Sequence, residues 1–347
     1  MRHVDVIIVG QGLAGSLLYH ALTRLGQRVV VVDAGLDQAA SMAAAGAMNP
    51  CASPRYTAPT PLNTWLGAAR STWLGLSESM GLRLYRRQRL IRLFRQANEA
   101  ERVEQRRADP AVAAVLSEPR PDSPTGLAAA PGHVEIDAGQ VDLPAYIQQT
   151  RQDLHQRGNL LEATFDTADL KTVPDGMCWG STRARAVVLC QGAAARRLPG
   201  LDALPWRISR GVALTLEGQD GWPSYAVNRG KSLIPLTDGR YWLGATYDRC
   251  LDDLEPSAAN QRELLRALDR LLASPGEPEV VDQRAGIRAG SHTGFPFCAR
   301  LPGDRALYLF SGLGSRGTLL GPHCANTLAR HLSHGESLPD AWNPWIS

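Results

Sequence analysis

Lysine is almost absent from this chain of 347 residues, which contains only Lys171 and Lys231, so arginine carries nearly all of the positive charge. The 37 basic and 34 acidic residues nearly balance, and the chain as a whole therefore indicates no polyanionic partner. A membrane-spanning run of about 18 apolar residues is missing, as are the charged and apolar regions of a signal peptide. We expect a soluble, cytoplasmic protein that does not bind a membrane.

Clustered metal-binding and redox motifs are also missing. The six cysteines stand far apart, at positions 51, 178, 190, 250, 298 and 324, and no C-x-x-C occurs. The eight histidines include no H-E-x-x-H. These absences exclude a zinc knuckle and a dithiol pair, and we expect no metal site and reduced, buried cysteines.

The chain opens with the pattern of a strand, a glycine-rich turn and a helix. Residues 4–9 form an apolar, β-branched run typical of a strand buried on both faces. Gly10-Gln11-Gly12-Leu13-Ala14-Gly15 then fits G-x-G-x-x-G, in which the glycines permit a tight turn, the approach of a pyrophosphate and close packing of helix on strand. Residues 16–25 are expected to form the helix, whose N-terminal N–H groups would face the phosphates.

A second expected strand, residues 28–32, leads to Asp33. An acid about 20 residues after the glycines accepts hydrogen bonds from ribose hydroxyls, and it disfavours NADP because it would repel the 2′-phosphate. The alternative is an ordinary tight turn in a chain with 33 glycines. Because the motif has its complete strand–helix–acid context, the sequence predicts a dinucleotide site.

A second glycine-rich turn lies near the other end of the sequence. Residues 307–310 read as an apolar strand, and Gly312–Gly317 leads into an expected helix over residues 318–332. A flexible loop is the alternative interpretation of these glycines. Between the two turns we expect helices over 143–157 and 258–273, and strands over 159–165, 184–189, 231–236 and 241–246. Two strand–glycine–helix units suggest that both ends of the chain surround one cofactor.

The order of motifs resembles that of the D-amino-acid oxidase and glycine oxidase family of flavoproteins. The resemblance is carried, after the first turn and Asp33, by residues 41–48, 139–142, 191–193, 234–246, 285–288 and 312–320. Within the family the sequence is most similar to the FAD oxidase domain of the bifunctional tRNA 5-methylaminomethyl-2-thiouridine biosynthesis enzyme, through residues 244–249, 314–317 and 45–47 with Pro50. The methyltransferase domain of that enzyme has no counterpart here.

The resemblance implies an α/β fold, with a Rossmann-like FAD-binding domain and an α+β substrate domain built on an antiparallel sheet. The FAD-binding domain is expected over 1–80, 133–205 and 285–347, and the substrate domain over 81–132 and 206–284. FAD is expected to be non-covalent, because Ile287 and Arg288 occupy the neighbourhood of the flavin-linking cysteine of the sarcosine oxidases. The implied reaction transfers a hydride from the amine-bearing carbon of a small amine or amino acid to flavin N5, with imine hydrolysis and oxygen as acceptor.

The same resemblance supplies the expected cofactor contacts. Small side chains in residues 43–46 would let the flavin approach the backbone, although plain packing is an alternative. The expected FAD-binding residues are Gly10, Gly12, Leu13, Ala14, Gly15, Asp33, Ala34, Ser41, Ala45, Gly46, Ala47, Met48, Phe165, Gln191, Gly192, Gly312, Leu313, Gly314, Ser315, Arg316, Gly317, Thr318 and Leu319.

Arg288 is the expected catalytic residue, at the place where the family's oxidases hold the substrate carboxylate with an arginine. A guanidinium matches a carboxylate at two points and would fix the α-carbon over the flavin. The chain departs from glycine oxidase at Ser232, which stands where that enzyme has a substrate-facing tyrosine. Tyr247 or His292 would line the pocket instead, or would be ordinary packed or surface residues.

Residues 82–107 are the one strongly basic run, with nine arginines against three glutamates. They would either contact tRNA phosphates or form solvated strand and helix faces, and we favour the second interpretation. Two alternative functions follow: oxidative removal of a carboxymethyl group from a modified tRNA wobble uridine, and FAD binding without catalysis.

Overall fold

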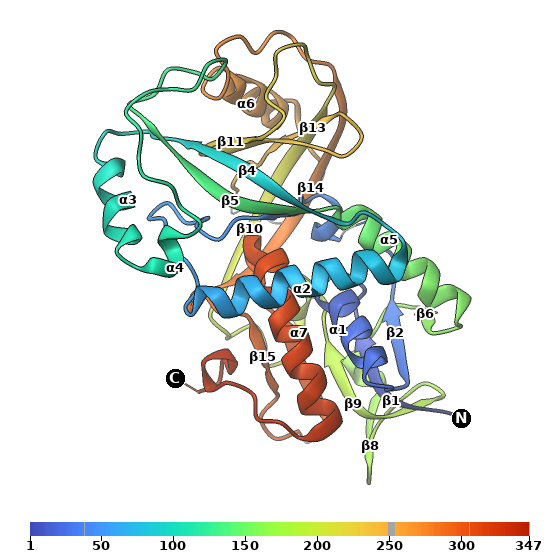
Figure 1. Cartoon of the computed structure of the whole chain (residues 1–347). Helices are drawn as coiled ribbons and strands as arrows, with labels where there is room; N and C mark the ends of the chain where they lie inside the picture. Colours follow the sequence, from blue (N-terminus) through green and yellow to red (C-terminus); the bar gives the residue numbers. More distant parts are fainter. Residues whose placement is uncertain (38, 249–253, 305, 347) are drawn as a thin grey trace. The chain divides into compact units, whose positions relative to one another are not determined.

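Two sets of residues pack mainly within themselves in the computed structural model, which describes residues 1–37, 39–248, 254–304 and 306–346. Unit 1 comprises Met1–Met42, Leu143–Ile208 and Ile287–Ser347, and unit 2 comprises Ala43–Asp142 and Ser209–Gly286. Arg249, the last residue of the motif at 244–249, and Cys250 lie outside the described residues. Figure 1 shows the elements of both units.

Unit 1 is built on the sheet that the opening motif predicts. Its strand order is β15-β16-β9-β1-β2-β6, with β8 pairing β9 and β7 pairing β8. The strands are β1 (Arg2–Val9), β2 (Val29–Asp33), β6 (Leu160–Glu162), β7 (Leu170–Val173), β8 (Gly176–Trp179), β9 (Thr182–Leu189), β15 (Phe297–Arg300) and β16 (Leu307–Ser311). β16, β9, β1, β2 and β6 run parallel, which brings the glycine turns after β1 and β16 to the same edge of the sheet.

Three long helices belong to unit 1. They are α1 (Leu13–Arg24), α5 (Leu143–Gln156) and α7 (Gly317–His334), and the short 3₁₀ turns are η1 (Ala40–Met42), η2 (Thr167–Asp169), η3 (Gly192–Arg197), η4 (Gly314–Arg316) and η5 (Asp340–Trp342). α1 and α7 lie side by side (Figure 1) because two glycines of α7 face α1: an added Cβ would stand 2.7 Å from Leu13 Cδ2 at Gly317 and 2.7 Å from Leu17 Cδ1 at Gly321. The two ends of the sequence therefore meet in one packed layer.

Unit 2 is built on a mainly antiparallel sheet of order β14-β10-β13-β12-β11-β4-β5-β3, in which β11 and β4 pair parallel. Its strands are β3 (Ala47–Met48), β4 (Tyr85–Leu93), β5 (His133–Val141), β10 (Trp206–Leu216), β11 (Ala226–Arg229), β12 (Lys231–Pro235), β13 (Tyr241–Gly244) and β14 (Val280–Ser291). The helices are α2 (Leu62–Met80), α3 (Glu99–Arg107), α4 (Pro110–Ala113) and α6 (Ala258–Leu268). A buried cluster that includes Leu214, Leu243 and Leu268 joins α6 to this sheet.

The expected fold class is confirmed, since a parallel sheet with helices accompanies a mainly antiparallel one. The contact division differs from the expected domain boundaries at 43–80 and 133–142, which pack in unit 2 because β3 and β4 both pair with β5. The assignment of FAD and substrate to separate domains stays a prediction. Among the described residues, no helix is both long and apolar enough to cross a bilayer.

Candidate cofactor and substrate site

The first glycine turn has the close contacts that its motif requires. Gly10 adopts φ +98°, and a Cβ there would lie 2.8 Å from the carbonyl oxygen of Cys190 at the end of β9. At Gly15 an added Cβ would lie 1.9 Å from Gly10 O, so this glycine is needed for packing of α1 against the turn. A Cβ added at Gly12 would meet only Ser41 Oγ, at 3.6 Å, so the outer side of this glycine can approach a ligand. Leu13 and Ala14 complete the buried first turn of α1.

Ser41 stands at the start of α1. Its hydroxyl oxygen accepts a hydrogen bond from the backbone N–H of Leu13 at 3.0 Å, and it thus satisfies one of the N–H groups that helix geometry leaves open. The hydroxyl proton of Ser41 remains available as a donor, which suits the phosphate-facing position expected for it.

Asp33, at the end of β2, is the centre of a polar network. Its Oδ2 accepts from the backbone N–H of Gln11 at 2.7 Å, while Oδ1 accepts from Gly35 N at 2.9 Å and from Arg151 Nη1 at 2.8 Å. Arg151, on α5, also donates to Gln11 Oε1 at 3.2 Å and to Glu162 at 2.8 Å. These hydrogen bonds fix the carboxylate at the dinucleotide turn, with 11 % of its side chain exposed.

Sequence reasoning missed the parts of Gln11 and Arg151 in this network. Gln11 is fully buried and donates through Nε2 to Ser16 Oγ and to the carbonyl oxygen of Ile147. A polar residue inside an otherwise small and apolar turn was a signal for Gln11. No signal marked Arg151, because only the register of α5 on the sheet brings it to Asp33.

Gln191 has a buried side-chain oxygen next to the first glycine turn. Its Oε1 is buried, and no donor among the described residues reaches it. The residue follows β9, and its Cα lies 3.2 Å from where a Cβ of Gly10 would be. The next residue, Gly192, has φ +55°, and its carbonyl oxygen accepts from Ser311 Oγ at 3.1 Å. A buried acceptor without a donor, beside a turn that only glycines allow, fits a bound dinucleotide.

The second glycine turn is shaped by close approach as well. Gly312 has φ +76°, and a Cβ there would lie 3.1 Å from Phe297 N; Gly314 has φ +56°. Leu313 is partly exposed and Ser315 is exposed, whereas Thr318 and Leu319 are buried in the first turn of α7. The contact of Gly317 with Leu13 gives this glycine a packing role whether or not it touches a ligand.

Arg316 ends the same turn. It donates through Nη2 to the carbonyl oxygen of Gly294 at 2.5 Å, which ties the turn to the loop after β14. Burial lowers the pKa of Arg316, and Arg207 nearby lowers it further. Two of the other expected contacts lie elsewhere in unit 1: Phe165 stacks on Trp179 within the core, with ring centroids 5.8 Å apart, and Ala34 is exposed next to Asp33.

The remaining expected cofactor contacts, Ala45, Gly46, Ala47 and Met48, belong to unit 2. Gly46 has φ +69°, and a Cβ there would come within 1.7 Å of the carbonyl oxygen of Val141. The segment therefore lies against β5 more closely than any side chain would allow.

The residues expected at the substrate are placed as follows. Arg288 is half-buried on the part of β14 that belongs to unit 1. In unit 2, Ser232 Oγ accepts from Asn228 Nδ2 at 2.8 Å, and Tyr247 is 59 % exposed. His292, in unit 1, is exposed. Among the described residues no group of His, Cys, Asp or Glu could hold a metal ion.

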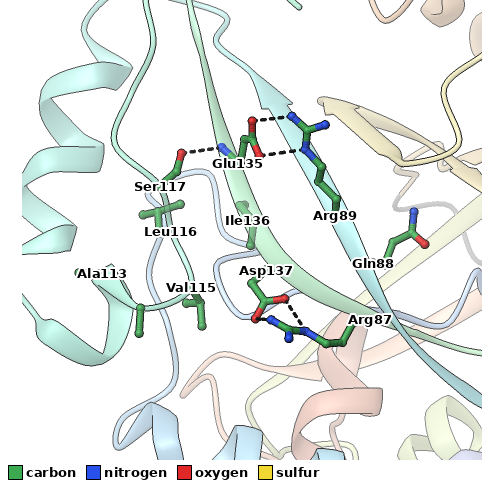
Figure 2. A pocket seen from close by; sticks show the side chains of 11 residues that line it. Arg87, Gln88, Arg89, Ala113, Val115, Leu116, Ser117, Glu135, Ile136 and Asp137 are labelled. Carbon is green, nitrogen blue, oxygen red and sulfur yellow. Dashed lines mark hydrogen bonds and ion pairs between the residues drawn. The ribbon is translucent and has the colours of Figure 1, made fainter.

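Most of the basic run at 82–107 is engaged inside unit 2. Figure 2 shows Arg87 paired with Asp137 and Arg89 with Glu135, along an open groove of about 410 Å³. Arg86 and Arg92 donate to backbone carbonyls, and so do Arg106 and Arg107. A cation that is already paired gains little from a phosphate, so these contacts argue against a surface made for nucleic acid.

Comparison with known proteins gives one family match and several relatives. The family model described as "FAD dependent oxidoreductase" matches residues 5–331. The glycine oxidase of Pseudomonas aeruginosa is 27% identical over 96% of this chain and 96% of its own length. The tRNA 5-methylaminomethyl-2-thiouridine biosynthesis bifunctional protein MnmC of Aromatoleum aromaticum is 32% identical over 52% of this chain, but the match spans only 31% of that relative.

Solved structures show the same fold. Glycine oxidase from Geobacillus kaustophilus superposes with a TM-score of 0.85 at 23% identity over 99% of both chains. Iminodiacetate oxidase from Chelativorans sp. BNC1 superposes with a TM-score of 0.81 at 22% identity over 98% of this chain and 99% of its own.

Proposed function

The chain belongs to the FAD dependent oxidoreductase family, and we propose that it oxidises a small amine or amino acid that bears a carboxylate. It is an FAD-dependent oxidoreductase of the glycine oxidase and amino-acid oxidase type. When bound, FAD supplies the acceptor for a hydride from the amine-bearing carbon; the imine product hydrolyses in water, and dioxygen is the proposed final acceptor. The observation that carries the proposal is the similarity to glycine oxidase over 96% of both chains.

Different residues of unit 1 are proposed to bind different parts of FAD. Asp33 would accept from the adenosine ribose, and the glycine turn with the N-terminus of α1 would face the pyrophosphate. The buried Gln191 Oε1, which no described donor reaches, would accept a hydrogen bond from FAD. Ala45–Met48 and the turn at Gly312–Leu319 are the proposed contacts of the flavin, and residues 81–132 and 206–284 are the proposed substrate domain.

Arg288 is the proposed substrate-orienting residue. Its guanidinium would bind the substrate carboxylate at two points and so fix the position of the α-carbon. Hydride transfer depends on the orientation of the amine-bearing carbon more than on a general base. Ser232, proposed to stand where glycine oxidase has a substrate-facing tyrosine, accepts a hydrogen bond from Asn228, so we propose a class of carboxylated amines rather than glycine alone.

The test is a screen of amines for hydrogen peroxide release. Glycine, sarcosine, iminodiacetate and D-amino acids are compared with the corresponding amines that lack a carboxylate. We expect turnover of at least one carboxylated amine by protein that contains non-covalent FAD. FAD-loaded protein that turns over none of them would favour FAD binding without catalysis.

Variants of Arg288 test its role separately from FAD binding. Arg288→Ala should keep FAD but lower kcat/KM for the carboxylated substrate at least about tenfold, because a charge-assisted pair contributes roughly 1.5–3 kcal/mol. Arg288→Lys should recover only part of this loss, since an ammonium lacks the planar two-point contact. An equal loss with amines that lack a carboxylate, or a loss of flavin, would assign Arg288 a structural role.

The second candidate, carboxymethyl removal from a tRNA wobble uridine, is favoured only by the partial similarity to MnmC. Filter binding of tRNA over a salt series separates it from the first, because each phosphate contact steepens the salt dependence. The internal pairing of Arg86, Arg87, Arg89 and Arg92 predicts weak binding with a shallow slope.

A further inference from the structure

Three donors of unit 2 hold the backbone of segment 43–48 by its carbonyl oxygens. Trp242 Nε1 donates to Ala43 O at 3.0 Å, and Gln140 Nε2 donates to Ala45 O at 3.2 Å. The backbone N–H of Val141 donates to Gly46 O at 2.9 Å. Ala47 and Met48 then join the sheet as β3. A stretch without any large polar side chain is thus fixed by donors from β5 and β13.

Arg86, on β4, fixes one of these donors in turn. Its Nε and Nη2 both donate to Gln140 Oε1, at 3.0 and 2.7 Å, and Nη2 also donates to the carbonyl oxygen of Pro235 at 2.5 Å. With its oxygen taken by the guanidinium, the amide of Gln140 can present only its N–H group to Ala45. Burial lowers the pKa of Arg86, and Arg83 nearby lowers it further. Arg86 therefore links the hairpin at Pro235 to the backbone of Ala45.

Two glycines outside the segment make room for these contacts. A Cβ at Gly139 would lie 2.6 Å from Tyr85 Cε2 and 2.8 Å from Met48 Cε. A Cβ at Gly244 would lie 2.7 Å from Trp242 Cη2, so a side chain at this position would overlap the indole. Three motifs that are far apart in the sequence, at 43–48, 139–142 and 244–246, thereby form one structure within unit 2.

The geometry of the peptide group determines where the N–H groups of this segment point. A trans peptide is planar, with its N–H opposite to its C=O. Because Ala43 O accepts from Trp242 and Ala45 O accepts from Gln140, the N–H of Ala44 points away from Trp242 and the N–H of Gly46 points away from Gln140. The side chains of residues 43–47 are methyl groups or a hydrogen, so these residues themselves cover the N–H groups little.

We propose that Trp242, Gln140 and Arg86 are positioning residues, which set the orientation of segment 43–48 and thereby the electronic environment of the flavin ring that it contacts. The proposal rests on the proposed function in one respect, the contact between this segment and FAD. It adds to that function the side chains that hold the contact in place, one of which reaches the hairpin at Pro235.

The test uses Trp242→Phe, Gln140→Glu and Arg86→Lys in FAD-loaded protein. Trp242→Phe keeps an aromatic ring without the N–H donor, and Gln140→Glu keeps the partner of Arg86 but loses the donor to Ala45. Each variant should retain FAD, whose adenosine end is held in unit 1, yet shift the visible absorption spectrum and the midpoint potential of the bound flavin. With a substrate, kcat should fall about three- to tenfold with little change in KM.

Arg87→Gln is the matched control, since Arg87 lies next to Arg86 on β4 but pairs with Asp137. It should leave the spectrum and the potential unchanged. Lower thermal stability in the three variants with an unchanged spectrum and potential would overturn the proposal, because a merely structural role predicts that result. If one variant does not fold, the other two still test the proposal, because they act at separate contacts.

Failure of the proposed function gives a different pattern. If no amine is turned over but the spectrum and the potential shift in the three variants, the amine oxidase proposal fails and the positioning role stands. If wild-type protein turns over an amine and the variants match it in spectrum, potential and kcat, the positioning role fails alone.

Discussion

The carboxylate of Asp33 connects three segments of unit 1. Its two oxygens accept hydrogen bonds from Gln11, Gly35 and Arg151, which come from the turn, from the next loop and from α5. A carboxylate fixed in this way loses little conformational freedom when a ribose binds, and it therefore favours affinity. Arg151 is fixed as well, because Glu162 accepts its other Nη.

Replacing Asp33 tests the adenosine position. Asp33→Ala removes the acceptor of the ribose hydroxyls and one partner of Arg151, which should cost about 1–3 kcal/mol of FAD affinity. Fluorescence titration of apoprotein with FAD measures this loss. The control is Asp175→Ala, which breaks an exposed pair with Arg183 in the same unit and should leave FAD affinity unchanged. FAD affinity that is equal in wild type and Asp33→Ala would place the adenosine elsewhere.

His20 predicts a dependence of stability on pH. Burial between α1 and α5 lowers the pKa of His20 to about 4, which outweighs the opposite effect of Asp153. The hydroxyl of Thr150 donates to Tyr146 O, so its oxygen accepts from Nε2–H of neutral His20. Since the unfolded chain binds the proton at higher pH than the folded chain, stability should fall as the pH falls from about 6.5 toward 4.

The measurement compares urea unfolding of wild type and His20→Gln at pH 7 and pH 4.5. The shift of the pKa implies that wild type loses about 2–3 kcal/mol more than the variant between these pH values. Carboxylates that do not interact with His20 contribute equally to both proteins and cancel in the comparison. Equal losses in the two proteins would show that His20 takes up its proton at the same pH in the folded and the unfolded chain.

At the scale of elements, the packing of α7 on α1 depends on glycine. Gly321→Ala would place a methyl 2.7 Å from Leu17 Cδ1, and the displaced leucine should cost about 1–3 kcal/mol, more than the gain in helix propensity. Gly67→Ala on α2 is the control, because its Cβ meets nothing within 4 Å and should stabilise by about 0.5–1 kcal/mol. Thermal unfolding should therefore shift in opposite directions, and a rise in both variants would contradict the tight contact.

Helices and strands beside the glycine turns could be predicted, but others were missed or misjudged in length. α2 was missed although Leu62, Trp65, Leu66, Ala69 and Trp73 follow helical spacing, since exposed glycines interrupt the pattern. The helix expected over 258–273 ends at Leu268, because Leu271 and Leu272 leave it to pair with the backbone of 127–128. The strand expected over 159–165 is shortened to Leu160–Glu162, and the side chain of Asp166 then caps η2.

At the scale of the molecule, the candidate site could be predicted only where its residues are close in sequence. The turn at Gly10–Gly15 and Asp33 follow from local spacing, and their geometry agrees with it. The contact of Arg151 with Asp33 spans 118 residues, and that of Trp242 with Ala43 spans 199. Contacts of this kind depend on the register of helices and strands, which no local pattern specifies.

Removal of FAD tests the molecule as a whole. A ligand that binds only the folded state at 100 times its Kd adds about 2.7 kcal/mol of stability, so the Tm of apoprotein should rise with added FAD. FMN lacks the adenosine that Asp33 is proposed to bind and should stabilise far less. Equal effects of FAD and FMN would remove the support for an adenosine site, and no effect of either would contradict specific flavin binding.

The close packing of Trp242 on Gly244 has a consequence for how such a sequence can change over generations. A methyl group at position 244 would occupy the space of the indole, so a larger residue there can be inherited only together with a smaller one at 242. The smaller residue would also give up the donor to Ala43. Positions 242 and 244 should therefore vary together among descendants of this chain, whereas any residue at 43 still offers the carbonyl oxygen to which Trp242 donates.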